Sequence, residues 1–103
     1  MTRLARAAAA TLLGLSSAVP AQDATLARNL AAVCANCHGT DGHARGDILK
    51  PLAGVPAEAI VAAMANYRSG ATPATVMQQI AKGFSDDQIK AIAAHFAAQR
   101  PGP

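Results

Sequence analysis

Aromatic residues are scarce in this chain of 103 residues, which contains one tyrosine, two phenylalanines and no tryptophan. Proteins that bind single-stranded nucleic acid stack the bases on aromatic side chains and follow the phosphates with clustered basic residues. This sequence has little to offer for stacking, and its nine lysines and arginines form no basic cluster. The composition therefore argues against a nucleic-acid partner.

A hydrophobic run long enough to cross a membrane is also missing from the N-terminal region. The apolar stretch from Ala7 to Leu15 is well short of the ~20 residues that span a bilayer. It follows Arg3 and Arg6 and precedes the small residues of Val19-Pro20-Ala21. This order of basic, apolar and small residues is typical of a secretory signal peptide.

We therefore expect residues 1–21 to be a signal peptide, cleaved after Ala21 or, as a second choice, after Ala18. An uncleaved membrane anchor is the alternative. Without the two arginines of the signal, residues 22–103 have seven basic and six acidic side chains and a net charge of +1. The sequence thus predicts one small domain exported to the periplasm, with no membrane span in its mature form.

Strand patterns are a third absence, since no stretch shows a convincing alternation of polar and apolar residues. Apolar residues recur instead at helical spacing, between segments rich in glycine and proline. The predicted helices are Ala24–Ala35, Ala57–Arg68, Val76–Lys82 and Asp86 to about Gln99, and the segment His38–Gly54 is predicted to be a loop. The expected fold class is all-α.

The longer predicted helices each have one apolar face that would pack in a core. These faces comprise Leu26, Leu30 and Val33 in the first helix, Ile60, Met64 and Tyr67 in the second, and Ile89, Ile92, Ala93 and Phe96 in the last. Asp23 or Thr25 would cap the first helix, and Ser85 with Gln88 forms a capping box for the last one. Large apolar residues are few, and domains of this size usually need a disulfide, a metal or another staple.

Only two cysteines are available as that staple, and they lie in the string Cys34-Ala35-Asn36-Cys37-His38. Two thiols at this spacing, followed directly by histidine, form the attachment pattern of c-type haem. Each thiol can add to one vinyl group of the porphyrin, and both vinyl groups lie on one edge of the ring, so the thiols must be close together. The imidazole of His38 can then reach the iron from one side. The motif predicts one covalently attached haem c.

Other uses of the cysteine pair fit less well. A thioredoxin-like dithiol would need a strand–helix–strand setting, which the sequence does not offer. A structural zinc ion would need four ligands, and His43 and His95 supply no second paired motif. A disulfide between Cys34 and Cys37 would close only a small loop and would add little to the core.

An iron held by His38 needs a ligand on its other face, and the candidates are Met64, Met77, His43 and His95. Met77 is favoured because the irregular segment before it can carry a thioether to the iron without following helix geometry. Met64 belongs to an apolar helix face and is expected to be a core methionine. His43 lies too near His38 in the chain to reach the opposite face. His95 flanks the last apolar face and is expected to be exposed.

Ligation by Met77 would fill the coordination sphere, raise the reduction potential and leave outer-sphere electron transfer as the function. If Met77 does not bind, the iron keeps an open position, and a peroxidase-like or gas-binding haem protein is the alternative. The Nδ1–H group of His38 needs a hydrogen-bond acceptor, and a backbone carbonyl near Lys50-Pro51 is the expected one. Alternatively, Pro51 only shapes the loop.

Several short pieces of the chain, the cysteine motif among them, occur together in known proteins. They are Cys34–Gly39, Leu52–Gly54, Tyr67–Gly70, Met77 and Phe84–Asp86. With these pieces the sequence resembles a class I bacterial cytochrome c over essentially all of residues 22–103. Within that class, Ala74–Asp86 is similar to the cytochrome subunit of flavocytochrome c sulfide dehydrogenase, although many members of that subfamily carry two haem motifs and this chain has one.

The resemblance implies a fold of three to five helices wrapped around one haem, with the first and last helices crossing through Leu26 and Leu30 against Ile92 and Phe96. It also implies Met77 as the distal ligand. Many relatives have proline two residues before the leucine of the Leu-Ala-Gly segment. This chain has Lys50 at that place and proline at the next position.

The chain is therefore expected to be an electron-transfer protein and not an enzyme, either a free carrier or a subunit of a complex. The expected donor is a flavoprotein that oxidises sulfide, and the expected acceptor is another cytochrome or a terminal oxidase. Tyr67, Arg68 and Pro51 are expected around the haem, where Arg68 could bind a propionate group. Lys50, Arg68 and Lys82 could also rim the haem edge and steer an acidic partner, or they could be ordinary solvated residues.

Overall fold

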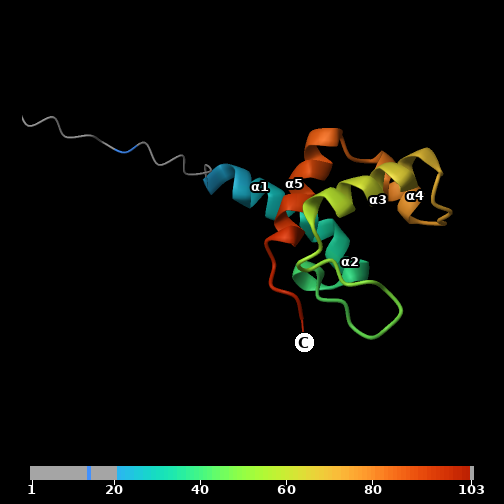
Figure 1. The fold of residues 1–103 in the computed structure, drawn as a ribbon, viewed down its shortest axis with the longest axis horizontal. Helices are drawn as coiled ribbons and strands as arrows, with labels where there is room; N and C mark the ends of the chain where they lie inside the picture. The colour runs from blue at the N-terminus through green and yellow to red at the C-terminus, as the bar shows by residue number, and fades with distance from the viewer. Residues whose placement is uncertain (1–13, 15–20, 103) are drawn as a thin grey trace, which may run out of the picture.

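The computed structural model of the protein describes residue 14 and residues 21–102. Within these residues every regular element is helical, which confirms the all-α class (Figure 1). The elements are α1 (Ala21–Ala31), η1 (Ala32–Cys34), α2 (Ala35–His38), η2 (Thr40–Gly42), α3 (Ala57–Ser69), α4 (Met77–Lys82) and α5 (Asp86–Ala97). None of the helices that these residues form has the length and apolar character required to cross a bilayer.

Helix α1 begins earlier than the sequence predicts. It starts at Ala21, not at Ala24, so Asp23 lies in its first turn and neither Asp23 nor Thr25 is its N-cap. Alanine is the strongest helix former, and the alanines on either side of Asp23 favour this longer helix. Apart from Gly14 and Ala21, the predicted signal peptide lies outside the described residues.

The sequence predicts that the first helix ends at Ala35. In the structure the helical path continues beyond α1 through a 3₁₀ turn, η1, into α2. His38 is therefore the last residue of a helix and not the first residue of a loop. The chain then reverses at Gly39, whose φ is +83°, and a Cβ atom there would collide with the carbonyl oxygen of His43. A glycine at this position lets the chain leave the helix directly after His38.

Helices α1 and α5 pack against each other, as expected for the first and last helices (Figure 1). The predicted contact forms only in part: Leu26 is 55% exposed, whereas Leu30 packs against the core cluster that contains Ile92 and Phe96. Ala31 and Ala93 are both buried in that cluster. Small side chains allow two helix backbones to approach closely. The buried face of α1 is therefore rotated away from Leu26.

The other two predicted apolar faces are confirmed. Ile60 and Met64 of α3 are buried, and Tyr67 is half-buried beside them. In α5 all four predicted residues are buried, with Phe96 and Ala93 almost completely so. The capping box at the start of α5 is present: Gln88 N–H donates to Ser85 Oγ at 3.2 Å, and Ser85 N–H donates to Gln88 Oε1 at 2.9 Å. These faces form one core cluster.

The segment between η2 and α3 is irregular, and backbone hydrogen bonds fix its ends. The carbonyl of Gly42 accepts from Leu52 N–H at 2.9 Å and from Ala53 N–H at 3.2 Å. At the next residue, Gly54 N–H donates to the carbonyl of Phe96 in α5 at 2.9 Å. The segment is thus attached to the turn after His38 at one place and to the last helix at another.

Candidate functional site

A cavity of about 600 Å³ lies among the helices, and most of its lining surface is apolar. Helices α2, α3, α4 and α5 each contribute lining residues, and these include Cys37 and His38, Met64 and Tyr67, Met77 and Ile80, and Ile92 and Phe96. The volume lies within the range of about 300–1,000 Å³ that is typical of ligand and cofactor sites. A mainly apolar cavity with a few polar groups suits a large, flat, apolar group.

Cys34 ends η1, Cys37 lies in α2, and both side chains border the cavity as free thiols. Cys34 is half-buried and Cys37 is exposed. Burial raises the pKa of the Cys34 thiol, and the negative charge of an ionised Cys37 raises it further, while a hydrogen bond with its own backbone lowers it. The helical path places the two thiols on one side of the chain, because residues three apart are neighbours on a helix surface.

The Nδ1 atom of His38 lies 2.9 Å from the carbonyl oxygen of Lys50. A carbonyl oxygen can only accept, so Nδ1 must carry the proton and donate it. The Nε2 atom then keeps its lone pair, which is the form that binds a metal. The acceptor predicted near Lys50-Pro51 is therefore confirmed as the carbonyl of Lys50, the residue that directly precedes Pro51.

Two methionines border the cavity, Met64 from α3 and Met77 from α4. Met64 is a core residue, since its side chain is only 6% exposed and it belongs to the buried cluster. Met77 is half-buried and is the first residue of its helix, directly after the irregular segment that precedes α4. Met77 lies at the end of a short helix, so its side chain can change position more easily than that of Met64.

His95 is partly buried, so the prediction that it is exposed is wrong. Its side chain is 11% exposed, and Nε2 lies 3.2 Å from Oδ1 of Asp41. Asp41 belongs to η2 and has a positive φ of 51°, which is unusual for a residue other than glycine. The turn after His38 covers this flank of α5, and no sequence pattern indicates a contact between residues so far apart.

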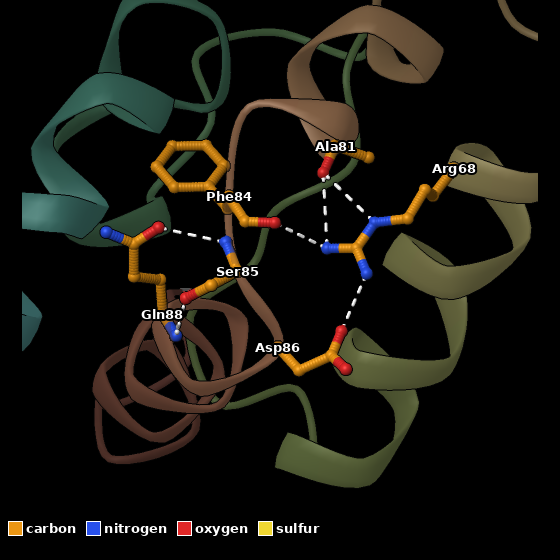
Figure 2. Close-up of polar contacts among 6 residues, drawn as sticks. All are labelled: Arg68, Ala81, Phe84, Ser85, Asp86 and Gln88. Atoms are coloured by element: carbon orange, nitrogen blue, oxygen red, sulfur yellow. Dashed lines mark hydrogen bonds and ion pairs between the residues drawn. The ribbon is translucent and has the colours of Figure 1, made fainter.

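The remaining predicted residues divide into two groups. Tyr67, Pro51 and Lys50 border the cavity. Arg68 lies outside the cavity lining and directs its guanidinium toward the end of α4 and the start of α5, where it donates to Asp86 and to backbone carbonyls (Figure 2). The geometry thus gives Arg68 partners within the protein. Lys82 is exposed at the end of α4, and His43 is exposed as well.

The residues that the cysteine motif and the helix pattern single out therefore meet around one cavity. Two thiols and a histidine with the metal-binding tautomer lie on one part of its wall, in an all-α fold whose first and last helices pack together. This combination defines a cytochrome c.

Comparison with known proteins agrees with that assignment. Residues 21–96 match the family described as cytochrome c oxidase, cbb3-type, subunit III, and the chain belongs to this family of cytochrome c domains. The family implies haem c as the cofactor, and the apolar cavity, the paired thiols and His38 fit such a group.

Relatives with curated names are cytochromes as well. The chain is 36% identical over 63 residues to the cytochrome subunit of sulfide dehydrogenase of Chlorobaculum tepidum. The matched region covers 61% of this chain and 56% of that protein. It is 34% identical over 82 residues to cytochrome c-554(548) of Halomonas halodenitrificans, covering 77% of this chain and 99% of that protein. It is 37% identical over 67 residues to the thiosulfate dehydrogenase electron acceptor of Stutzerimonas stutzeri, covering 62% of this chain and 31% of that protein.

These relatives are named as cytochromes, cytochrome subunits or electron acceptors. The matched regions span about half of the sulfide dehydrogenase subunit and about a third of the thiosulfate dehydrogenase acceptor.

Proposed function

We propose that this protein is a periplasmic cytochrome with one haem, attached covalently through Cys34 and Cys37 and ligated by His38 and Met77. The observation that carries the proposal is the hydrogen bond from His38 Nδ1 to the Lys50 carbonyl beside the paired thiols. It fixes the imidazole in the tautomer and orientation that a proximal ligand needs. The haem supplies a one-electron couple between ferric and ferrous iron.

The chain's own residues would make that couple suitable for electron transfer. The apolar wall excludes water from the ring, and the thioether of Met77 favours the reduced form and raises the reduction potential. A second protein ligand also occupies the position at which oxygen or a substrate would bind. The protein therefore acts by outer-sphere transfer, one electron at a time.

The proposed partner is a dehydrogenase, in particular a flavoprotein that oxidises sulfide. Two relatives support a dehydrogenase, since one is named as a subunit of sulfide dehydrogenase and another as the electron acceptor of thiosulfate dehydrogenase. Another cytochrome or a terminal oxidase would then accept the electron. Co-purification with a flavin-containing chain would support the subunit role, and purification as a lone monomer would support a free carrier.

The test of the proposal uses protein made with its full N-terminus in a host that attaches haem c. Intact mass should equal residues 22–103 plus one haem, in the periplasmic fraction, and a pyridine haemochrome spectrum should give the c-type signal. A colourless protein with the mass of bare polypeptide would refute haem attachment. A mass that retains residues 1–21 would refute signal cleavage alone.

The ligation by Met77 is tested separately on the same sample. Ferric protein should show the far-red absorption band of iron–methionine ligation, and Met77→Ala should abolish it while keeping the haem. A wild-type protein without the band, which binds cyanide or carbon monoxide rapidly, would instead be an open-site haem protein. Loss of the band in Met64→Ala but not in Met77→Ala would assign the ligand to Met64.

A further inference from the structure

Helix α4 has few internal features that stabilise it or fix its position. Its six residues, Met77–Lys82, are far fewer than the ~12–15 that an isolated helix needs for marginal stability in water. Val76 stands at its N-cap, and a valine side chain has no oxygen to accept from the first N–H groups of the helix. The position of α4, and hence of Met77, must therefore come from contacts with other elements.

One guanidinium group provides such contacts at the other end of α4. Arg68, near the end of α3, donates from Nε to the carbonyl of Ala81 at 3.4 Å and from Nη2 to the carbonyl of Phe84 at 2.5 Å. Its Nη1 atom lies 2.6 Å from Oδ1 of Asp86, the first residue of α5. Figure 2 shows the side chain reaching from α3 to the connection between α4 and α5.

These contacts join three helices at one point. The carbonyl of Ala81 belongs to the last turn of α4, the carbonyl of Phe84 follows that helix, and Asp86 begins α5. Carbonyls at a helix C-terminus lack partners within the helix, and a cation there also interacts favourably with the helix dipole. Arg68 satisfies carbonyls at this end of α4, and Ala81 itself is completely buried.

We propose that Arg68 is a positioning residue for Met77, acting through α4. A helix of six residues is a short rod of about 9 Å, so a change at its C-terminal end changes the place of its first residue. With Arg68 in place, Met77 stays within reach of the iron; without it, α4 can shift and the thioether leaves more often. This inference rests on the proposed ligation by Met77.

The contacts of Arg68 should not contribute equally. Asp86 is 81% exposed, and an exposed ion pair is worth little, so its removal should have a small effect. The side chain of Arg68 is 34% exposed, and its bonds to the carbonyls lie on the partly buried side. Hydrogen bonds from a charged donor are among the stronger ones. Lysine at position 68 would keep the charge but would lack the planar fork that reaches several acceptors at once.

The test is the rate at which cyanide binds to the ferric holoprotein, because cyanide can bind only after the methionine has left the iron. Arg68→Met should accelerate binding by roughly tenfold, as expected for the loss of charged hydrogen bonds. Arg68→Lys should give a smaller acceleration, and Asp86→Asn should change the rate by no more than about threefold. Asp87→Asn is the matched control, since it removes the neighbouring acid of the same helix turn, and it should leave the rate unchanged.

A general loss of stability must be separated from a shift of α4. In urea, the far-red band of Arg68→Met should disappear at a lower concentration than the helical circular dichroism signal. In Ser85→Ala, which weakens α5 without touching the contacts of Arg68, the two signals should disappear together. If Arg68→Met does not accumulate, the same comparison is made with Arg68→Lys.

The outcomes distinguish the inference from the proposed function. A wild-type protein without the methionine band would refute the ligation by Met77, and the inference with it. A wild-type protein that has the band, and loses it in Met77→Ala, while the Arg68 variants bind cyanide at the wild-type rate, would refute the inference alone. Coincident loss of both signals in the Arg68 variants would also refute it, because Arg68 would then act on overall stability only.

Discussion

The two sides of the cavity are held in place by different means. On the side of His38, the cysteine pair and the reversal at Gly39 are neighbours in the chain, and the Lys50 carbonyl comes from the loop that follows. On the side of Met77, the helix is short and its contacts come from α3 and from the start of α5. The proximal side is thus specified by a local motif together with contacts to a loop and to α5, and the distal side by tertiary contacts.

This difference suggests that the two ligands differ in how easily they are lost. A histidine tethered by two neighbouring covalent bonds can hardly leave the iron while the chain remains attached. A methionine carried by a short helix can leave whenever that helix moves. Substitutions on either side should therefore give different results, and the following experiments are arranged from the largest expected effect to the smallest.

Production of the chain without its haem should affect both sides at once. In Cys34→Ala/Cys37→Ala, the apolar wall of the 600 Å³ cavity would face water, and a domain of this size has little other core to compensate. We expect most of the helical signal in far-ultraviolet circular dichroism to be lost. The control is Cys37→Ala, which should keep at most one thioether and give a poor yield of haem protein. A cooperative thermal transition with native helix content in the double variant would contradict this expectation.

A substitution at Gly42 should weaken the proximal side. Its φ is +80°, and a Cβ atom there would lie 2.6 Å from the backbone nitrogen of Ala53, which donates to the Gly42 carbonyl. Gly42→Ala combines the cost of a left-handed backbone with that of a steric clash and should destabilise the holoprotein by about 2–5 kcal/mol.

Gly46→Ala is the matched control for that experiment. Gly46 has a similar φ of +73°, but a Cβ atom there would contact nothing within 4 Å. Gly46→Ala should therefore destabilise the holoprotein only by the cost of a left-handed backbone, about 1–2 kcal/mol. Thermal unfolding of the two holoproteins measures the difference, and equal melting temperatures would show that the close approach to Ala53 is unimportant.

Removal of the cap of α5 should have the smallest effect. Ser85→Ala deletes the oxygen that accepts from Gln88 N–H and should cost about 1 kcal/mol, which lowers the melting temperature by roughly 4–8 °C in a domain of this size. Ser85→Asp keeps an acceptor at the cap and should remain near the wild-type value. If the aspartate variant melts as early as the alanine variant, the capping bond does not stabilise α5.

The proximal side could be predicted largely from the sequence. The cysteine motif with its histidine, like the capping box of Ser85 and Gln88 in α5, is a pattern of neighbouring residues. Such patterns work because the geometry of a few adjacent residues is nearly fixed. The apolar faces of α3 and α5 were predictable for the same reason, since a helix places every third or fourth residue on one side.

The distal side and the packing of α1 could not be predicted in this way. Nothing local indicates that Arg68 reaches Phe84 and Asp86, or that His95 pairs with Asp41 across more than fifty residues. Leu26 was expected in the core because it is large and apolar, yet it is exposed and the small Ala31 is buried in its place. Those outcomes depend on how the helices meet, which a pattern within one helix does not contain.

The last helix also governs the order in which this fold can be completed. His95 holds the turn at Asp41, and the Phe96 carbonyl holds the backbone at Gly54. Each of these hydrogen bonds joins residues far apart in the chain. Such contacts form slowly in folding, because closing a long loop costs conformational entropy. We expect the two segments that flank the cavity to stay loose in a chain that ends before His95, and to become protected from hydrogen exchange only when the final turns of α5 are present.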